Sequence, residues 1–348
     1  MAAYTTIDDP GLYFNTIIWT GSSDTAGRAF TGVGFEPDLV WQKIRNDTYN
    51  HKLYDSVRGA GNDKELMTDT WGPEGASSAE TYGYLSSFDA DGFTTTAGTS
   101  GSAGNLHWNQ NTYKFVAWNW KESADAGFDI ISFTGTGSAR TVSHSLSAVP
   151  KLIIVKTRST DEYDWLVYHG ANTSAPETDA LRLGQDGDTN NTDDDASYWN
   201  DTAPTSSVFT VGTSGYSNKN TDSMIAYAFA EKQGFSKFGG YTGNGNADGV
   251  FIYLGFKPAW FLCKNTQDDG DNWVLHDNKR NTFNVTDEGL AATSNIVEFT
   301  DVDMDFLSNG VKIRNNTGRS NGTSKTFIYA AFAETPFVNS NGVPCNAK

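Results

Sequence analysis

The sequence predicts an all-β protein made of three tandem antiparallel β-sandwich domains. The first observation behind this prediction is composition: the chain contains 35 glycines, and aromatic residues make up 13% of it. Short stretches rich in Thr, Val, Phe, Tyr and Trp alternate with clusters of Gly, Asn, Asp and Ser, a pattern typical of short strands joined by turns. No stretch has the periodicity of an amphipathic helix. The second observation is an internal repeat.

Four landmarks recur three times in the same order. Each copy has a Thr-Gly pair after an aromatic residue, an apolar segment that follows a proline and ends in lysine, a three-residue strand, and a closing strand. Pro37, Pro150 and Pro258 lie 113 and then 108 residues apart. Such regular spacing indicates a tandem triplication. The segments are WTG (19–21), FTGTG (133–137) and YTGNG (241–245); GFEPDLVWQK (34–43), SAVPKLIIVK (147–156) and GFKPAWFLCK (255–264); LYD (53–55), VYH (167–169) and LHD (275–277); KFVAWNWKE (114–122), MIAYAFAE (224–231) and FIYAAFAE (327–334).

The repeat sets the expected domain boundaries. We place the first repeat at residues 1–122, the second at 127–232 and the third at 234–335, followed by a C-terminal tail at 336–348. A copy of about 110 residues with roughly seven or eight short strands has the size of one β-sandwich, of a jelly-roll or lectin-like kind. The junctions are only a few residues long, so we expect either a rigid rod or a compact triad.

The first two landmarks have structural interpretations. The glycine after threonine supplies a residue that can adopt positive φ at a turn. Proline lacks an N–H group and suits the start of a strand. The segment after it is apolar on both faces of the pleat, which predicts a central strand covered on both sides. Lys43, Lys156 and Lys264 end this strand and are expected to extend into water.

The closing strands share one large ring at the same register. This ring is Trp120 in the first repeat, Phe229 in the second and Phe332 in the third, and alanines flank the two phenylalanines. Alternate residues of a strand face opposite sides. We therefore expect the rings to fill a core and the alanines to allow another layer to approach closely.

The chain carries 25 Lys and Arg against 42 Asp and Glu, a formal net charge of -17 that is spread along its length. Such a surface repels the phosphates of nucleic acids and anionic lipids, so neither a nucleic-acid partner nor membrane insertion is expected. No run approaches the roughly 18 apolar residues of a membrane-spanning helix, and the N-terminus lacks the features of a signal peptide. Cys263 and Cys345 do not make a disulfide framework. We expect a soluble protein made in a reducing cytoplasm.

No catalytic residue is predicted. The sequence lacks a Gly-x-Ser-x-Gly elbow, a His-Glu-x-x-His motif and a phosphate-binding glycine loop. His169 and His276 stand where the first repeat has Asp55, and a position that accepts either residue type favours a structural role over a catalytic one. A glycan-degrading enzyme would need two carboxylates about 5–10 Å apart in a groove, and no pair among the many acids is singled out. We expect a protein that is not an enzyme.

One acidic loop is a candidate Ca²⁺ site. The segment DGDTNNTDDD (186–195) places Asp186, Asp188 and Asn190 at alternate positions, with Asp194 further on, as oxygen-rich Ca²⁺ loops do. It lacks the glycine and the glutamate that complete an EF-hand, and a solvated turn is the alternative interpretation. No other cofactor is expected.

Three tryptophans are candidates for contact with a glycan or another ligand. Trp71, Trp108 and Trp199 lie outside the shared strands, in surroundings rich in Gly, Asn and Ser. On an exposed loop, such rings could stack against sugars. Partial burial against a neighbouring domain is the alternative interpretation.

Six segments carry a resemblance to a known family. They are HKLYDSVRGA (51–60), SSFDADGFTTT (86–96), YKFVAWNWK (113–121), FTGTGSARTVSHSLSAVPKLIIVKTRS (133–159), FAEKQGFSKFGGYTGNGNADGVFIYLGFKPAWFLCK (229–264) and FIYAAFAETPF (327–337). In these segments the chain resembles repeat modules of structural and tail-associated proteins of tailed bacteriophages, marine phages especially. The resemblance implies a β-sandwich virion component and brings no catalytic residue with it. The chain has no evident coiled-coil stalk of a long tail fibre.

The leading hypothesis is a non-enzymatic virion protein that acts through assembly contacts, as a capsid decoration, a head fibre or a tail-associated subunit. Its expected partners are other capsid or tail proteins, and we expect a homo-oligomer or many copies on one particle. The expected location is the virion, after synthesis in the host cytoplasm. The alternative is a receptor- or glycan-binding tail protein that uses the loop aromatics.

Overall fold

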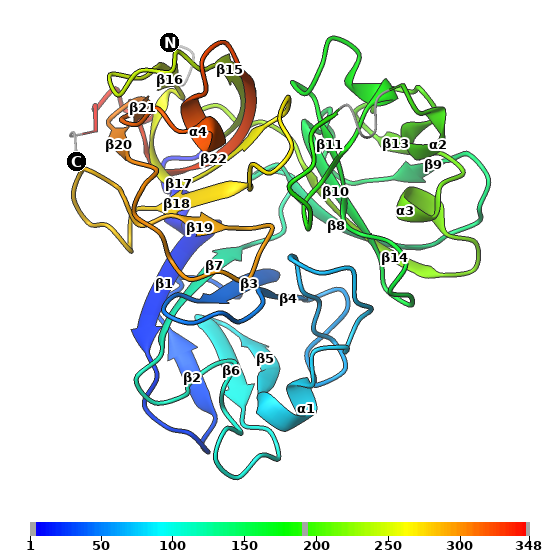
Figure 1. The fold of residues 1–348 in the computed structure, drawn as a ribbon, viewed down its shortest axis with the longest axis vertical. Helices are drawn as coiled ribbons and strands as arrows, with labels where there is room; N and C mark the ends of the chain where they lie inside the picture. The colour runs from blue at the N-terminus through cyan, green and yellow to red at the C-terminus, as the bar shows by residue number, and fades with distance from the viewer. Residues whose placement is uncertain (1–4, 190–193, 346–348) are drawn as a thin grey trace.

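The computed structural model describes residues 5–189 and 194–345, and within them every pairing between named strands is antiparallel (Figure 1). The few helices are three or four residues long. This confirms the predicted all-β fold. None of the described helices is long and apolar enough to cross a bilayer.

The first repeat contains a four-stranded sheet, in the order β1-β7-β3-β4, and a three-stranded sheet, in the order β2-β6-β5. Side chains from both sheets, among them Val40, Phe115 and Phe93, form one buried core, so the sheets pack against each other. The elements are η1 (Pro10–Leu12), β1 (Phe14–Thr20), β2 (Arg28–Thr31), β3 (Leu39–Ile44), β4 (Lys52–Asp55), α1 (Ala79–Tyr82), β5 (Tyr84–Asp89), β6 (Gly92–Thr96) and β7 (Lys114–Trp120).

The second repeat contains a five-stranded sheet, in the order β12-β11-β10-β14-β8, and a two-stranded sheet of β13 and β9. Val155 of the large sheet and Phe209 of the small one belong to one buried core. The elements are β8 (Phe128–Thr134), β9 (Arg140–Ser143), β10 (Leu152–Thr157), β11 (Leu166–His169), η2 (Pro176–Thr178), β12 (Leu181–Arg182), α2 (Ala196–Trp199), β13 (Val208–Val211), α3 (Gly215–Asn218) and β14 (Ser223–Phe229).

The third repeat contains a five-stranded sheet, in the order β15-β22-β17-β18-β19, and a three-stranded sheet, in the order β16-β21-β20. Phe261 of the large sheet and Val311 of the small one share a buried core. The elements are β15 (Ser236–Thr242), β16 (Phe251–Tyr253), β17 (Phe256–Asn265), β18 (Val274–Asp277), β19 (Leu290–Ala291), β20 (Met304–Leu307), β21 (Gly310–Ile313), α4 (Gly318–Asn321) and β22 (Thr326–Pro336).

The three large sheets share one connection order. In each, the first strand of the repeat pairs with the closing strand, the closing strand pairs with the strand that follows the proline, and the short strand comes next. Figure 1 shows the three lobes, coloured blue to cyan, green, and yellow to red, around a common centre. Of the two arrangements that the short junctions allow, the molecule has the compact one.

The strand that follows the proline is the central strand of each large sheet, as predicted. β3, β10 and β17 each have a paired neighbour on both sides, and nearly all their residues are buried. Pro37 and Pro150 precede their strands by two residues. Pro258 lies inside β17 at a shift in the pairing register. The hydrogen-bond ladder is already irregular there, so the missing N–H of proline interrupts no regular pairing.

The Thr-Gly pairs need glycine for a different reason from the one expected. None of Gly21, Gly135 and Gly243 has positive φ. A Cβ atom would instead lie 1.8 Å from the Gln110 carbonyl oxygen at Gly21 and 1.9 Å from that of Lys219 at Gly135. The side-chain-free backbone therefore allows the first strand of a repeat to approach the loop before its closing strand.

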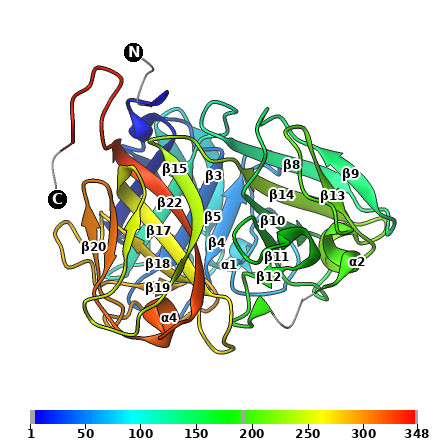
Figure 2. The same cartoon turned by 90° about the horizontal axis from the view of Figure 1, so that it is seen from above.

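The C-terminal tail folds back onto the start of the chain. Asp8 accepts a hydrogen bond of 2.7 Å from the Ser340 backbone N–H, and the Phe337 carbonyl accepts one of 2.9 Å from the N–H of Cys345. Figure 2 shows this tail and the η1 segment on the same side of the molecule. Cys263 and Cys345 are free thiols.

Candidate functional site

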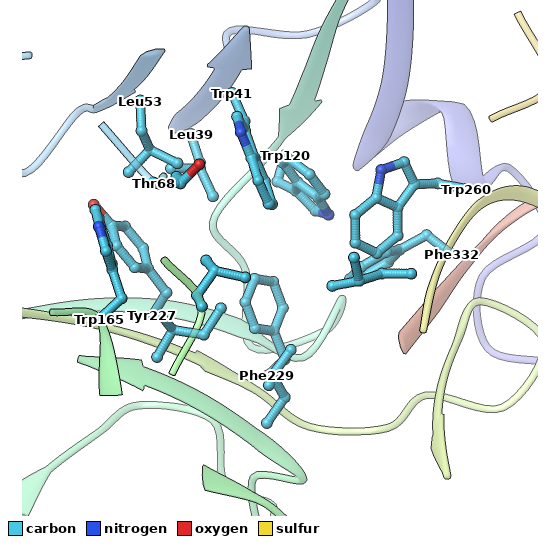
Figure 3. Close-up of a pocket in the computed structure, with 14 residues that line it drawn as sticks. Leu39, Trp41, Leu53, Thr68, Trp120, Trp165, Tyr227, Phe229, Trp260 and Phe332 are labelled. Atoms are coloured by element: carbon cyan, nitrogen blue, oxygen red, sulfur yellow. The ribbon is translucent and has the colours of Figure 1, made fainter. Parts of the chain in front are cut away.

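The centre of the molecule is an aromatic core to which all three repeats contribute. Trp120, Phe229 and Phe332 converge there with Trp41 and Trp260 (Figure 3). The ring centroids of Trp120 and Phe332 lie 5.7 Å apart, as do those of Phe229 and Phe332. A small cavity of about 40 Å³ remains among these rings, lined by aromatic and aliphatic side chains and by Thr68.

This arrangement shows which core the large rings of the closing strands fill. The large rings do not fill the core of their own repeat; they fill one core shared by three repeats. The flanking Ala226 and Ala228 face the opposite way, into the core between the two sheets of the second repeat. Ala331 and Ala333 do the same in the third repeat.

A second set of contacts joins the end of each short strand to the closing strand of another repeat. The residues that end the short strands are Asp55, His169 and Asp277. They pair with equivalent positions of the central strands, which are Leu39, Leu152 and Trp260. All are buried. The contacts are Tyr227 hydroxyl to Asp55 Oδ2 at 2.6 Å, His169 Nε2 to the Tyr329 carbonyl oxygen at 3.0 Å, and Trp118 Nε1 to Asp277 Oδ2 at 2.9 Å.

The pairing register shows that the prediction that both His169 and His276 stand where the first repeat has Asp55 is wrong for His276. His169 does stand where the first repeat has Asp55. His276 pairs with Phe261 and stands one position earlier, where the first repeat has Tyr54. His169 accepts a hydrogen bond at Nδ1 from the Ala171 N–H, so Nε2 carries the proton that it donates to Tyr329. Burial lowers the pKa of His169 to about 4, and the ring is a neutral structural link.

A chain of polar groups runs along each border between repeats and starts near Asp55, His169 or Asp277. At the border of the first and second repeats, Asp55 pairs with Arg58, Arg58 with Glu74 at 3.0 Å, and Glu74 with Arg158 at 2.6 Å. The border of the third and first repeats has the same chain in Asp277, Arg280, Glu298 and Arg45.

At the remaining border, between the second and third repeats, the equivalent contacts join polar side chains and the backbone. Asn172 accepts a hydrogen bond of 2.7 Å from the Thr189 hydroxyl, and Thr189 donates its N–H to the carbonyl of Thr266 at 3.0 Å. The N–H groups of Glu74 and Glu298 make the equivalent backbone bonds to Arg158 and Arg45. The backbone contact thus recurs at all three borders.

The lysines that end the central strands are buried, so the expectation that they extend into water is wrong. Lys156 donates to the carbonyl oxygens of Trp71 at 2.9 Å and Tyr163 at 2.7 Å. Lys264 donates to the backbone carbonyl oxygens of Asp186 and Asp271. Lys43 donates to those of Ile44 and Asp47. Burial lowers the pKa of each ammonium to about 8, and nearby aspartates oppose that shift. Loops from neighbouring segments cover the strand ends.

The described residues of the acidic loop do not form a metal-binding cluster. Asp186 uses its carbonyl oxygen to accept from Lys264, the Asp188 N–H donates to Asp269 at 3.0 Å, and the Asp194 N–H donates to Asp179 at 3.2 Å. Asn190 lies outside the described residues. Within residues 5–189 and 194–345, no three His, Cys, Asp or Glu side chains are grouped as they would be around a metal.

The structure separates the three candidate tryptophans. Trp71 has 59% of its surface exposed and remains a candidate for ligand contact. Trp108 and Trp199 are buried, so the prediction that they stack on a ligand is wrong for both. Trp108 packs edge-on against Tyr54 and Phe93. Trp199 lies in the core of the second repeat, where its indole N–H donates to the Asp179 carbonyl at 3.1 Å. Flanking polar residues did not reveal that these rings point inward.

An open polar pocket of about 490 Å³ lies in the first repeat. Buried Lys52, Met67 and His107 form part of its lining, together with half-buried Tyr49 and Tyr82. Exposed loop residues with short side chains border the mouth of the pocket: Thr48, Ala76 and Ser78. Asn295 of the third repeat also lines the pocket. The pocket lies at the border of the first and third repeats.

A buried ion pair lies at the base of this pocket. The Lys52 ammonium is 2.9 Å from Glu65 Oε1, and the Tyr54 hydroxyl is 3.4 Å from the other carboxylate oxygen. Burial raises the pKa of Glu65, and the charge of Lys52 opposes that rise. Burial, and then Lys52, hold the pKa of His107 well below its ordinary value, so the imidazole is neutral at pH 7. Its Nδ1 lies 3.8 Å from Glu65 Oε2.

Sequence reasoning missed the Lys52–Glu65 pair, although a signal was present. Both residues stand one position before a cross-strand pair that recurs in every repeat: Leu53 with Leu66, Val167 with Leu181, and Leu275 with Leu290. The equivalents of the ion pair are Leu166 and Ala180 in the second repeat, and Val274 and Gly289 in the third. Leu166, Ala180 and Val274 all belong to apolar cores. A charged pair at positions that are otherwise apolar marks the first repeat as specialised.

Comparison with known proteins identifies a family. No curated protein and no solved structure matches the chain. One family model, described as "Domain of unknown function (DUF7483)", matches residues 9–336, which includes all three repeats and the contacts between them. The chain therefore belongs to the DUF7483 family.

Proposed function

We propose that this chain is a non-enzymatic structural protein of a tailed-bacteriophage virion, built by triplication of one β-sandwich unit. The units are the repeats at residues 1–122, 127–232 and 234–335. The shared strand order of the three large sheets supports the triplication. The resemblance of the six segments quoted above supports the place in a virion.

The observation that carries the structural role is the set of buried contacts that recurs at the borders between repeats. Tyr227 with Asp55, His169 with Tyr329, and Trp118 with Asp277 link the repeats around the shared aromatic core. Buried, hydrogen-bonded links hold neighbouring units at a fixed angle. The product is a rigid block that presents three related faces, which suits a subunit that acts through shape and assembly contacts. Its net charge of -17 keeps many copies apart in solution.

Cryo-electron microscopy of the intact particle tests this role. Density that matches the chain on the capsid shell is the result expected for a decoration or head-fibre protein, and density at the tail is expected for a tail-associated subunit. Absence of the chain from purified particles, checked by mass spectrometry, would overturn the proposal.

A second candidate role is binding of a host glycan or receptor. Two observations favour it: Trp71 is 59% exposed, and the polar pocket of the first repeat is open to solvent. Trp108 and Trp199 no longer contribute to this role because both are buried.

A further inference from the structure

We propose that the polar pocket of the first repeat binds a neutral saccharide, with Lys52 as a hydrogen-bond donor at its base. This inference rests on the second candidate role, glycan binding, and names the site and the class of ligand. It is independent of where the chain lies on a particle.

Stability does not explain the Lys52–Glu65 ion pair. Removing two charges from water is costly, and apolar residues of similar volume commonly replace a buried ion pair with no loss of stability or with a gain. The second repeat has such a replacement in Leu166 and Ala180, and both are buried. Lys52 and Glu65 therefore act at the pocket that Lys52 lines.

The charges at the base of the pocket cancel. Glu65 cancels the charge of Lys52 at a distance of 2.9 Å, and His107 is neutral because burial lowers its pKa. No aspartate or glutamate is among the described residues that line the pocket. A site without net charge, inside a chain of net charge -17, favours an uncharged ligand over an anion or a cation.

The lining of the pocket offers a ligand both hydrogen-bond donors and acceptors. Asn50 and Asn295 offer amides, Thr48 and Ser78 offer hydroxyls, and all four line the pocket. Lys52 carries three N–H groups, of which one donates to Glu65 among the described contacts. Donors and acceptors placed around one cavity match a ligand with many hydroxyl groups, each of which both donates and accepts.

The lining of the pocket also has an apolar part. Tyr49 and Tyr82 present rings, and Met67 and Leu106 present aliphatic surface. Sugars have C–H faces between their hydroxyl groups, so they need both kinds of surface. The volume of about 490 Å³ lies within the range of about 300–1,000 Å³ typical of small-molecule sites.

The test uses the full chain and saturation-transfer-difference NMR with glucose, galactose, mannose and N-acetylglucosamine, each at up to about 20 mM, a range that covers weak millimolar binding. We expect saturable binding of at least one sugar. The double variant K52L/E65A gives the first repeat the residues of the second, and we expect at least tenfold weaker binding. Ala76→Trp blocks the mouth and leaves the ion pair in place, and we expect the same loss.

Phe283→Ala is the matched control because it removes an exposed ring that does not line the pocket. We expect it to bind as the parent does. Trp71→Ala tests the other candidate for ligand contact. Near-UV circular dichroism of every variant checks folding, and Ala76→Trp keeps the test decisive if the double variant does not fold.

Three results would overturn the inference. They are no binding of any of the four sugars, binding unchanged in both pocket variants, and loss of binding in Trp71→Ala alone. The last result would keep glycan binding as a role and move its site to the Trp71 loop, so failure of this site and failure of the second role are distinguishable.

Discussion

The hydroxyl of Tyr227, in the second repeat, donates a 2.6 Å hydrogen bond to the carboxylate of Asp55, in the first. Both groups are buried, and 172 residues of chain separate them. Asp55 also pairs with Arg58, so the phenol hydroxyl joins a charged network that extends to Arg158. One hydrogen bond thus connects the aromatic centre of the molecule to the ion pairs at its border.

Tyr227→Phe removes this bond and leaves the ring in place. Because the acceptor is a buried carboxylate, we expect the free energy of unfolding to fall by roughly 1.5–3 kcal/mol, measured by urea denaturation. Tyr13→Phe is the control, since the Tyr13 hydroxyl makes none of the hydrogen bonds found among the described residues. Equal stability of the two variants would contradict a role for the Tyr227–Asp55 bond in joining the repeats.

The Thr-Gly turns predict a strict requirement for glycine. In Gly135→Ala, the new Cβ would lie 1.9 Å from the Lys219 carbonyl oxygen, so the backbone must shift. We expect a loss of roughly 1–3 kcal/mol in the free energy of unfolding. At Gly101 a Cβ meets nothing within 4 Å, and Gly101→Ala should leave stability nearly unchanged. Thermal unfolding followed by circular dichroism compares the two, and a tolerated Gly135→Ala would show that close approach is not what requires glycine.

Thr68 lines the central cavity, and its buried hydroxyl has no hydrogen-bond partner among the described residues. Valine has nearly the same shape without the hydroxyl, so we expect Thr68→Val to raise the free energy of unfolding by about 1 kcal/mol. Thr157 is equally buried, but its hydroxyl donates to Asp222 at 3.1 Å. Thr157→Val should therefore destabilise the chain. Chemical denaturation of both variants gives the comparison, and a destabilised Thr68→Val would mean that its hydroxyl is satisfied.

The buried lysines predict a rise in stability with pH. Burial lowers the pKa of Lys156 from 10.5 to about 8, so between these values the unfolded chain binds more protons than the folded chain. The free energy of unfolding therefore increases with pH in this window, by up to about 1.4 kcal/mol per pH unit for one lysine. This contribution is lost as the pH falls through 8.

Lys156→Met isolates the effect because it removes the titrating group and keeps an unbranched side chain. Urea denaturation of the parent and the variant between pH 8 and 9.5 should show a shallower slope for Lys156→Met. Cysteine titrations cancel in this difference because both proteins contain Cys263 and Cys345. Parallel slopes would rule out a depressed pKa at Lys156.

Parts of the candidate site were open to prediction and parts were not. Lys52 and Glu65 differ in charge from the aligned residues of the other repeats, so the sequence contained a signal for the pocket. The burial of Trp108 and Trp199 had no such signal. Polar neighbours in sequence are a poor guide to a ring's surroundings when the loop that carries it folds back over a sheet, as the contact of Trp108 with Tyr54 illustrates.

The all-β class and the central position of β3, β10 and β17 could be predicted from the sequence alone. These follow from local patterns: two-residue alternation, apolar runs and proline placement act within a few residues. The tertiary structure sets the surroundings of Lys156, which ends an apolar strand and donates to the carbonyl of Trp71, 85 residues away in the chain. It also decided that Trp120, Phe229 and Phe332 meet in one core. Burial depends on which distant surfaces pack together, and that information lies in the contacts between repeats, outside any single segment.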